Sequence, residues 1–232
     1  MKTETKFLML FISLTGIFLL FISGCKKSDD PSPTPVTITD IDGNVYHTVT
    51  IGTQVWLVED LKSTKYRDGT SIVQEIDNAA WSTLTTAAYC DYDNSTSNGA
   101  TYGHLYNWFA VHDSRNICPS GWHVPSDAEW TTLTDFLGGK SVAGGKMKET
   151  GTAHWLSPNT GATDEVGFKA LPGGERRATG QYIYLGEYGC RWSSTENDAQ
   201  QAWIRYVGNS EVDVTNQLYN KNYGYSVRCI KD

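Results

Sequence analysis

The feature that most limits the fold is a lone strong helix signature in a chain of strand and turn signals. The segment Ser126–Glu129 has the capping-box pattern, in which a serine hydroxyl accepts from a backbone N–H and a glutamate reaches back. Apolar residues follow at helical spacing from Trp130 to Leu137, and Gly138-Gly139 predicts the helix end. A weaker second helix is expected over Gly144–Glu149. Such a chain is not a helical bundle.

Strand and turn signals fill most of the remaining chain. Asp42-Gly43 between Ile41 and Val45 predicts a hairpin. Further strands are expected at 49–58, 191–194, 202–207 and 225–230, and a long polar loop at 90–103. The 22 Gly, 8 Trp and 13 Tyr favour a loop-rich, aromatic domain. About 200 residues are enough for one core, so the sequence predicts a single α+β domain over residues 37–232.

The N-terminus predicts export. Two lysines precede an apolar run over residues 7–22, as in a secretory signal. The run ends at Ser23-Gly24-Cys25, which resembles the lipobox of bacterial lipoproteins. That resemblance implies lipidation of Cys25 and removal of residues 1–24 as a lipoprotein signal peptide. The alternative is an ordinary signal peptide or an uncleaved anchor with a chance cysteine.

A polar segment rich in Pro, Ser and Thr follows over residues 25–36 and predicts a flexible tether. Its Cys-Lys-Lys-Ser-Asp-Asp start resembles the export signals of surface lipoproteins. We therefore expect a protein that is lipid-anchored through Cys25 at the outer membrane or cell surface.

The charge of the chain disfavours two classes of partner. The net charge is −7, and residues 1–24 carry +1, so the chain from Cys25 onward has −8. An acidic domain is a poor partner for nucleic acid. It will not adhere to anionic lipid by charge either, which leaves the acyl chains to hold the membrane.

Six ordered segments carry a family resemblance: YGHLYNWFAV, CPSGWHVPSDAEW, GFKALPGG, WSSTE, AWIR and YSVRCI. They resemble the Fibrobacter succinogenes major paralogous domain from about Val49 to Lys231. Members of that family are typically exported bacterial proteins and lipoproteins of unknown activity. The family resembles the C-type-lectin-like fold, which implies a twisted antiparallel sheet with one or two flanking helices and long loops.

Four cysteines lie in the predicted domain: Cys90, Cys118, Cys190 and Cys229. An even number in an oxidising compartment predicts disulfides, with three possible connectivities. The lectin-like resemblance implies a bridge from the region before the first helix to the last strand, which pairs Cys118 with Cys229 and leaves Cys90 with Cys190. In the alternative, Cys118 is a nucleophile with His123 as its base. No third orienting residue is marked, so the bridge is favoured.

Metal and cofactor sites are not expected. The segment Trp203-Ile204-Arg205 stands where calcium-dependent lectins carry oxygen ligands, and isoleucine and arginine cannot supply them. Asp91, Asp93 and Asn94 could hold calcium in a loop, but polar loops usually look like this without metal. Enzymes of the formylglycine-generating type share the fold, but the cysteine spacing does not match their redox pair.

The resemblance places ligands on loops and neighbouring strand ends. Candidate ligand residues are Arg176, Arg177, Tyr182, Tyr184, Glu196, Asn197 and Asp198. The tryptophans Trp122, Trp192 and Trp203 are interpreted as structural. We expect a non-catalytic domain that binds or displays, without calcium, with a glycan, a peptide or another envelope protein as its partner. The alternatives are an extracellular enzyme acting on polysaccharide, which needs two carboxylates at a set separation, and a passive structural component of the surface.

Overall fold

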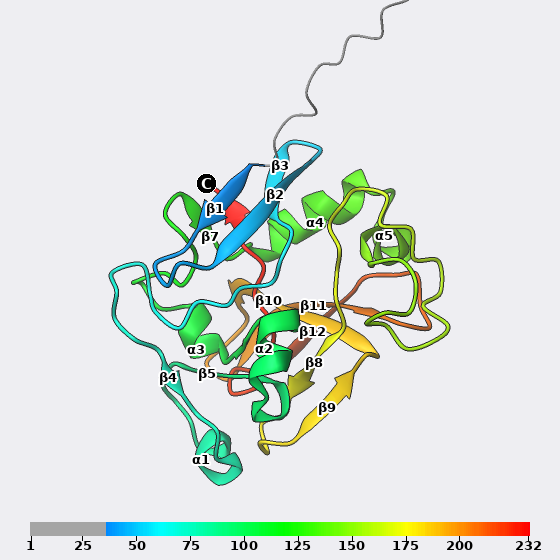
Figure 1. Cartoon of the computed structure of the whole chain (residues 1–232). Coiled ribbons are helices and arrows are strands. Elements are labelled where there is room, and N and C mark those ends of the chain that lie inside the picture. Colours follow the sequence, from blue (N-terminus) through cyan, green and yellow to red (C-terminus); the bar gives the residue numbers. More distant parts are fainter. Residues whose placement is uncertain (1–35) are drawn as a thin grey trace, which may run out of the picture. The chain divides into compact units, whose positions relative to one another are not determined.

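The computed structural model describes residues 36–232 and shows an α+β arrangement of short helices and three small sheets (Figure 1). The predicted signal peptide, the lipidation site Cys25 and all of the tether except Val36 lie outside the described residues. No helix in residues 36–232 is long and apolar enough to cross a membrane. The predicted α+β class is confirmed. The expected single antiparallel sheet is replaced by three sheets that include two parallel strand pairs.

The helices within residues 36–232 are short, and the longest of them is the predicted one. Their bounds are α1 (Asn78–Ser82), the 3₁₀ turn η1 (Tyr92–Asn94), α2 (Thr96–Tyr102), α3 (Trp108–Val111), α4 (Asp127–Phe136) and α5 (Lys140–Met147). At α4 the capping box is present, with the Glu129 backbone N–H donating to the Ser126 hydroxyl at 3.3 Å. Helix α5 begins four residues before the expected start at Gly144.

The predicted long loop over residues 90–103 is wrong, because η1 and α2 occupy most of it. A close tertiary contact accompanies this helical turn. A Cβ atom at Gly99 would lie 1.9 Å from Oδ1 of Asp91, so the helix packs tightly on that carboxylate. Polar residues without apolar periodicity gave no local sign of the helix.

The first sheet joins the two ends of the domain. Its order is β1 (Thr37–Thr39), β2 (Val45–Ile51), β3 (Gln54–Leu57), β13 (Ile230–Lys231) and β7 (Trp122–His123). The predicted hairpin at Asp42-Gly43 is confirmed, with Gly43 at φ +87°, a conformation that glycine adopts without strain. A second tight turn at Gly52 connects β2 to β3.

The central sheet is the largest by residue count and carries the site described below. Its order is β12 (Thr215–Asn220), β11 (Gln201–Gly208), β10 (Tyr188–Glu196), β8 (Gly173–Arg176) and β9 (Tyr182–Leu185). Strands β8 and β10 run parallel, and the other neighbours are antiparallel. Figure 1 shows the β8–β9 hairpin at the end of the domain opposite the first sheet and α4.

A third small sheet consists of β4 (Val73–Gln74), β5 (Ala88–Cys90) and β6 (Leu105–Tyr106). Aromatic side chains fill the space between the layers. The rings of Trp56 and Trp130, which is on α4, have centroids 4.8 Å apart and planes tilted by 42°, and Trp192 on β10 meets Tyr225 edge to face at 4.9 Å. Most of the tryptophans are thus core residues. Trp122 and Trp192 are buried as predicted, and Trp203 is half-buried.

Candidate functional site

One face of the central sheet is hollowed into a cavity of about 140 Å³. All five strands contribute to it, because residues two apart on a strand share a face and paired residues stand side by side. The lining residues are Glu175, Tyr184, Tyr188, Cys190, Ile204, Tyr206 and Tyr219. We refer to this cavity as the tyrosine pocket.

A buried carboxylate is the charged group of the tyrosine pocket. Glu175 on β8 is only 5% exposed, and the buried hydroxyl of Tyr225 lies near its carboxylate. Arg177 Nε lies 3.8 Å from Glu175 Oε1, on a side chain that is 43% exposed. Burial raises the pKa of the Glu175 carboxyl, and the neighbouring Tyr225 hydroxyl and Arg177 offset the rise only in part. The fold thus holds a carboxylate that it does not neutralise fully.

Aromatic rings form the walls of the tyrosine pocket. The centroids of Tyr184 and Tyr188 are 5.1 Å apart with ring planes at 71°, and those of Tyr188 and Tyr206 are 5.5 Å apart at 82°. The planes of neighbouring rings are therefore nearly perpendicular to each other. Burial, with the nearby Glu175 carboxylate, raises the pKa of Tyr219 to about 12, so this phenol stays neutral near pH 7.

Tyr184 adopts an unusual backbone conformation at the mouth of the pocket. Its φ is +69°, in the left-handed region that non-glycine residues seldom enter. The conformation belongs to a turn in which the Glu187 N–H donates to the Tyr184 carbonyl at 3.0 Å. The ring is 39% exposed, so it is accessible from solvent as well as from the pocket.

The predicted bridge between Cys90 and Cys190 is wrong. Both cysteines are free and buried, and they pack in different clusters. Cys90 lies with Trp81 and Leu105, whereas Cys190 lines the tyrosine pocket. Burial, and then the nearby Glu175 carboxylate, raise the pKa of the Cys190 thiol well above its usual value. Such a thiol is a poor nucleophile, because the thiolate is the reactive form.

Arg176, one of the predicted ligand residues, is buried within the fold. The side chain is fully buried, with its guanidinium 4.3 Å from the Trp81 ring centroid. It donates to the carbonyls of Gly180 and Glu75 at 3.0 and 2.5 Å, and to Asn78 Oδ1 at 3.0 Å. Arg176 therefore fastens the segment before α1 to the β8–β9 hairpin.

The other candidates separate into two groups. Arg177 and Tyr184 lie beside the tyrosine pocket, with the guanidinium carbon 6.0 Å from the ring centroid. Tyr182 is not among the residues that line it; its ring lies 5.3 Å from that of Tyr92, and its hydroxyl donates to Asn94 Oδ1 at 2.7 Å. The exposed segment Glu196-Asn197-Asp198 begins at the last residue of β10, at the far end of that strand. At about 3.3 Å per strand residue, it lies roughly 20 Å from the pocket end of that strand. The ligand candidates, which were expected to form one binding surface, therefore lie on two separate surfaces.

The predicted bridge between Cys118 and Cys229 is confirmed. Its sulfur atoms are bonded, so Cys118 is not a nucleophile. His123 instead contacts two carboxylates, with Nδ1 2.7 Å from Asp232 and Nε2 2.9 Å from Glu129. The disulfide joins the segment before β7 to the residue before β13, and these two strands pair in the first sheet.

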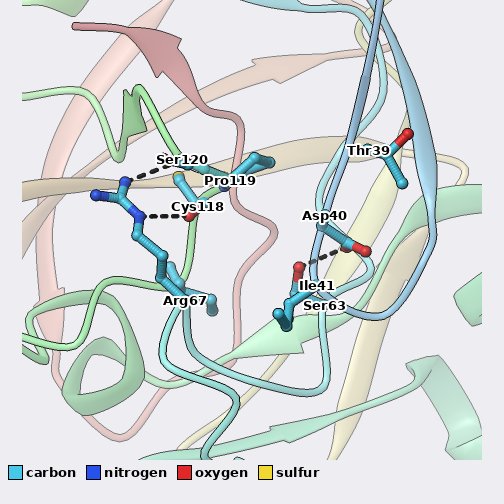
Figure 2. A pocket seen from close by; sticks show the side chains of 9 residues that line it. Thr39, Asp40, Ile41, Ser63, Arg67, Cys118, Pro119 and Ser120 are labelled. Carbon is cyan, nitrogen blue, oxygen red and sulfur yellow. Dashed lines mark hydrogen bonds between the residues drawn. The ribbon is translucent and has the colours of Figure 1, made fainter.

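A second cavity of about 210 Å³ lies beside this disulfide. Figure 2 shows the Arg67 guanidinium directed at the loop of Cys118 and Pro119, to whose carbonyls it donates at 3.4 and 3.0 Å. The Asp40 carboxylate on the other side accepts from Ser63 at 2.6 Å and from Tyr46 at 2.8 Å. These charged groups already have hydrogen-bond partners within the domain, so they are not free to bind a ligand in this cavity.

A further hollow of about 420 Å³ is bordered by His47, Glu59, Asp60, Glu149 and Lys169 among others. Three of its carboxylates are already engaged. His47 lies 2.6 Å from Glu59, Asp60 is bound by two arginines, and Glu149 lies 2.7 Å from His154. Paired groups of this kind support the fold.

The suspected calcium loop has other contacts. His104 Nδ1 lies 2.6 Å from the Asp91 carboxylate, and Asn94 is engaged by Tyr182. Among residues 36–232, no group of three His, Cys, Asp or Glu side chains could hold a metal ion.

Sequence reasoning missed Glu175, Tyr188, Tyr206 and Tyr219. The available signal was tyrosine at alternate or isolated strand positions where an apolar core residue is usual, together with a glutamate directly after Gly173-Gly174 in a strand. The order of the strands, which brings these residues together, has no local sequence signal.

A family model, the Fibrobacter succinogenes major domain, matches residues 49–231. The chain belongs to this family. The matched range includes every strand of the tyrosine pocket and both cysteines of the disulfide. Comparisons with curated proteins and with solved structures found no match.

Proposed function

We propose that this family member is a lipid-anchored cell-envelope protein whose domain binds a ligand, without catalysis, in the tyrosine pocket. The observation that carries the proposal is Glu175, a buried carboxylate whose charge the fold leaves poorly compensated inside a wall of tyrosines. Binding sites combine apolar and aromatic walls with a few placed polar groups. Tyrosine adds a rigid ring with a polar tip, which suits a glycan, a peptide or an envelope partner.

Two observations favour binding over the rival polysaccharide-degrading enzyme. Glu175 is the sole carboxylate among the residues that line the pocket, whereas glycoside hydrolysis uses a pair. The one thiol in the pocket has a raised pKa and is a poor nucleophile. A passive structural role would not account for a buried charge that the fold compensates only in part, because such a charge destabilises a fold.

A binding screen tests the proposal. The full chain, purified in detergent, is screened against glycans and envelope extracts, and every hit is repeated with Tyr206→Ala and with the control Tyr102→Ala. Tyr102 is a half-buried tyrosine that does not line the pocket. We expect a ligand whose binding weakens at least tenfold in Tyr206→Ala only. Release of reducing sugar from a polysaccharide by the wild type would support the enzyme instead.

The lipid anchor has its own test. The Ser23-Gly24-Cys25 motif supports acylation of Cys25. Metabolic labelling with an alkyne fatty acid should tag the wild type and leave Cys25→Ser unlabelled, and protease accessibility on intact cells then distinguishes a surface from an inner-facing location. Equal labelling of both proteins rules the anchor out.

We further propose that the domain has a C-type-lectin-like arrangement. The pairing of the first strands with β13 in one sheet, the early helix α4 and the long loops support it. An experimental structure that fails to superpose on lectin-like domains over the central sheet would reject this likeness.

A further inference from the structure

The chemistry of the tyrosine pocket selects among ligands by charge. Glu175 is buried, and its one cationic neighbour among residues 36–232, Arg177, lies at 3.8 Å on a side chain that is 43% exposed. An ionised carboxylate removed from water is costly unless a cation or strong donors replace its hydration. A neutral ligand would leave that cost in place, whereas a cation would remove it. The electrostatics therefore favour a positively charged ligand group.

The walls favour the same kind of group. A ring face carries partial negative charge and attracts an ammonium within about 6 Å of its centroid. Tyr184, Tyr188 and Tyr206 meet nearly at right angles, so their rings border the cavity from different directions. Tyr219, on β12, lines the pocket as well. Several rings and one carboxylate around a small space form a cage for an organic cation.

The size of the pocket limits what enters it. Its volume is about 140 Å³. Pockets that enclose whole drug-sized ligands occupy about 300–1,000 Å³. The tyrosine pocket therefore accommodates one group of a ligand, while the remainder stays outside near Tyr184 and Arg177, which are both exposed.

We propose that the tyrosine pocket binds an organic ammonium group, primary or quaternary, through Glu175 and its tyrosine walls. This assignment rests on the proposed binding function and names the ligand chemistry of the same site. Arg177 acts as an internal competitor, since its guanidinium is 3.8 Å from Glu175 and 6.0 Å from Tyr184 and must move aside when a cation enters.

A matched pair of small molecules tests the charge directly. Choline and 3,3-dimethyl-1-butanol have nearly the same shape, but choline alone is charged. Binding of each to the full chain in detergent is measured by calorimetry, with glucosamine and the methyl ester of Nα-acetyl-lysine as primary ammonium probes. At least one of the three cations should bind ten times more tightly than the neutral alcohol. Equal affinity for charged and neutral probes overturns the proposal.

Variants then assign the contacts. Glu175→Gln keeps the shape and removes the charge, so cation affinity should fall at least tenfold. Glu165→Gln, an exposed carboxylate paired with Lys146 at 3.5 Å, should have no effect. Tyr206→Phe keeps the ring and should retain binding, whereas Tyr206→Leu should lose it. Arg177→Ala should tighten binding. Thermal unfolding of each variant confirms folding, and unchanged affinity in a folded Glu175→Gln contradicts the assignment.

The outcome separates this inference from the proposed function. A neutral glycan or peptide that binds and depends on Tyr206 would overturn the ammonium assignment and leave the binding function standing. Absence of any ligand that depends on Tyr206, with every cation failing as well, would overturn both.

Discussion

Arg191 binds Asp60 through two parallel hydrogen bonds, from Nε to Oδ1 at 2.8 Å and from Nη2 to Oδ2 at 2.7 Å. Arg228 Nε donates to Oδ1 of the same carboxylate at 2.8 Å. All three side chains are buried, and they connect the segment after β3 to β10 and to the segment before β13. One carboxylate thus holds together parts of the chain that are far apart in sequence.

Asp60→Asn should destabilise the domain strongly, because two buried guanidiniums would lose their counter-charge. Breaking a buried ion pair from one side costs about 3–5 kcal/mol. The free energy of unfolding, measured with urea, should fall by about that amount, while the exposed Asp135→Asn should change it by no more than about 0.5 kcal/mol. An Asp60→Asn protein as stable as the wild type would contradict the assigned role.

The same cluster predicts a response to acid. Burial alone would raise the pKa of Asp60, but Arg191 and Arg228 outweigh it and the pKa is lowered. Because the pKa of Asp60 is lower in the folded than in the unfolded protein, its carboxylate stabilises the fold at pH values above the unfolded-state pKa, near 3.8. This stabilisation is lost as the pH falls through the folded-state pKa. Wild-type stability should therefore decrease more steeply than that of Asp60→Asn below about pH 4. If the free energies of unfolding of the two proteins decreased in parallel with falling pH, Asp60 would not be the group that makes the fold sensitive to acid.

Removal of the disulfide should weaken the domain, since it closes a loop of 111 residues between Cys118 and Cys229. The chain-entropy model assigns such a loop about 4–5 kcal/mol. The double variant Cys118→Ala, Cys229→Ala should lose up to that amount by urea unfolding. The matched double variant Cys90→Ala, Cys190→Ala removes two buried free thiols and leaves the bridge intact.

Thiol labelling checks the pairing itself. Under non-reducing denaturation, alkylation should modify Cys90 and Cys190 and spare Cys118 and Cys229. Without denaturant, neither buried thiol should react. A peptide map linking Cys90 to Cys190 would overturn the structure at that point.

Local signals allowed prediction of local features. The hairpin at Asp42-Gly43 and the capping box at Ser126 depend on residues within a few positions of each other, so the sequence sufficed for both. The Cys118–Cys229 bridge followed from family resemblance. Arg176 was predicted to lie in a loop because it follows Pro-Gly-Gly. Its burial depends on the acceptors Glu75 and Asn78, which lie about a hundred residues earlier in the chain.

The tyrosine pocket could not be predicted from the sequence either, because its residues come together through contacts between distant parts of the chain. Tyr184 and Arg177 were expected among the ligand candidates because they were interpreted as loop residues near Pro-Gly-Gly. Tyr206 and Tyr219 join them only through the strand order β12-β11-β10-β8-β9, which includes a parallel pairing. Long-range pairing of that kind is set by the whole core, and no residue pattern along the chain indicates it.

Lys148 should be a structural residue despite its charge. The ammonium is buried and donates to the carbonyls of Thr160, Gly208 and Glu211 at 2.9, 2.7 and 2.7 Å. Lys148→Met would leave three inward carbonyls without donors, which should cost about 3 kcal/mol or more. The control Lys146→Met removes a half-exposed ammonium from α5, the helix that Lys148 follows, and should be nearly neutral. Equal unfolding midpoints for the two variants would contradict this role.

Glu175 should make the domain less stable as the pH rises above about 4.5, and a cation should reverse the effect. Burial raises the pKa of its carboxyl above the usual 4.5, so the folded state retains a proton that the unfolded state releases. At pH values below the unfolded-state pKa of Glu175, its carboxyl is protonated in both states and does not change the stability. Stability is lost as the pH rises from the unfolded-state pKa through the folded-state pKa.

The groups facing Glu175 do not share that window. Tyr219, Tyr225 and Cys190 stay neutral because burial raises their pKa values. The stability of the wild type minus that of Glu175→Gln should therefore fall with rising pH across the window. A bound ammonium favours the carboxylate, so choline should raise the unfolding temperature of the wild type more at pH 7 than at pH 4. A choline effect that is the same at both pH values, or the same in Glu175→Gln, would show that the carboxylate does not receive the cation.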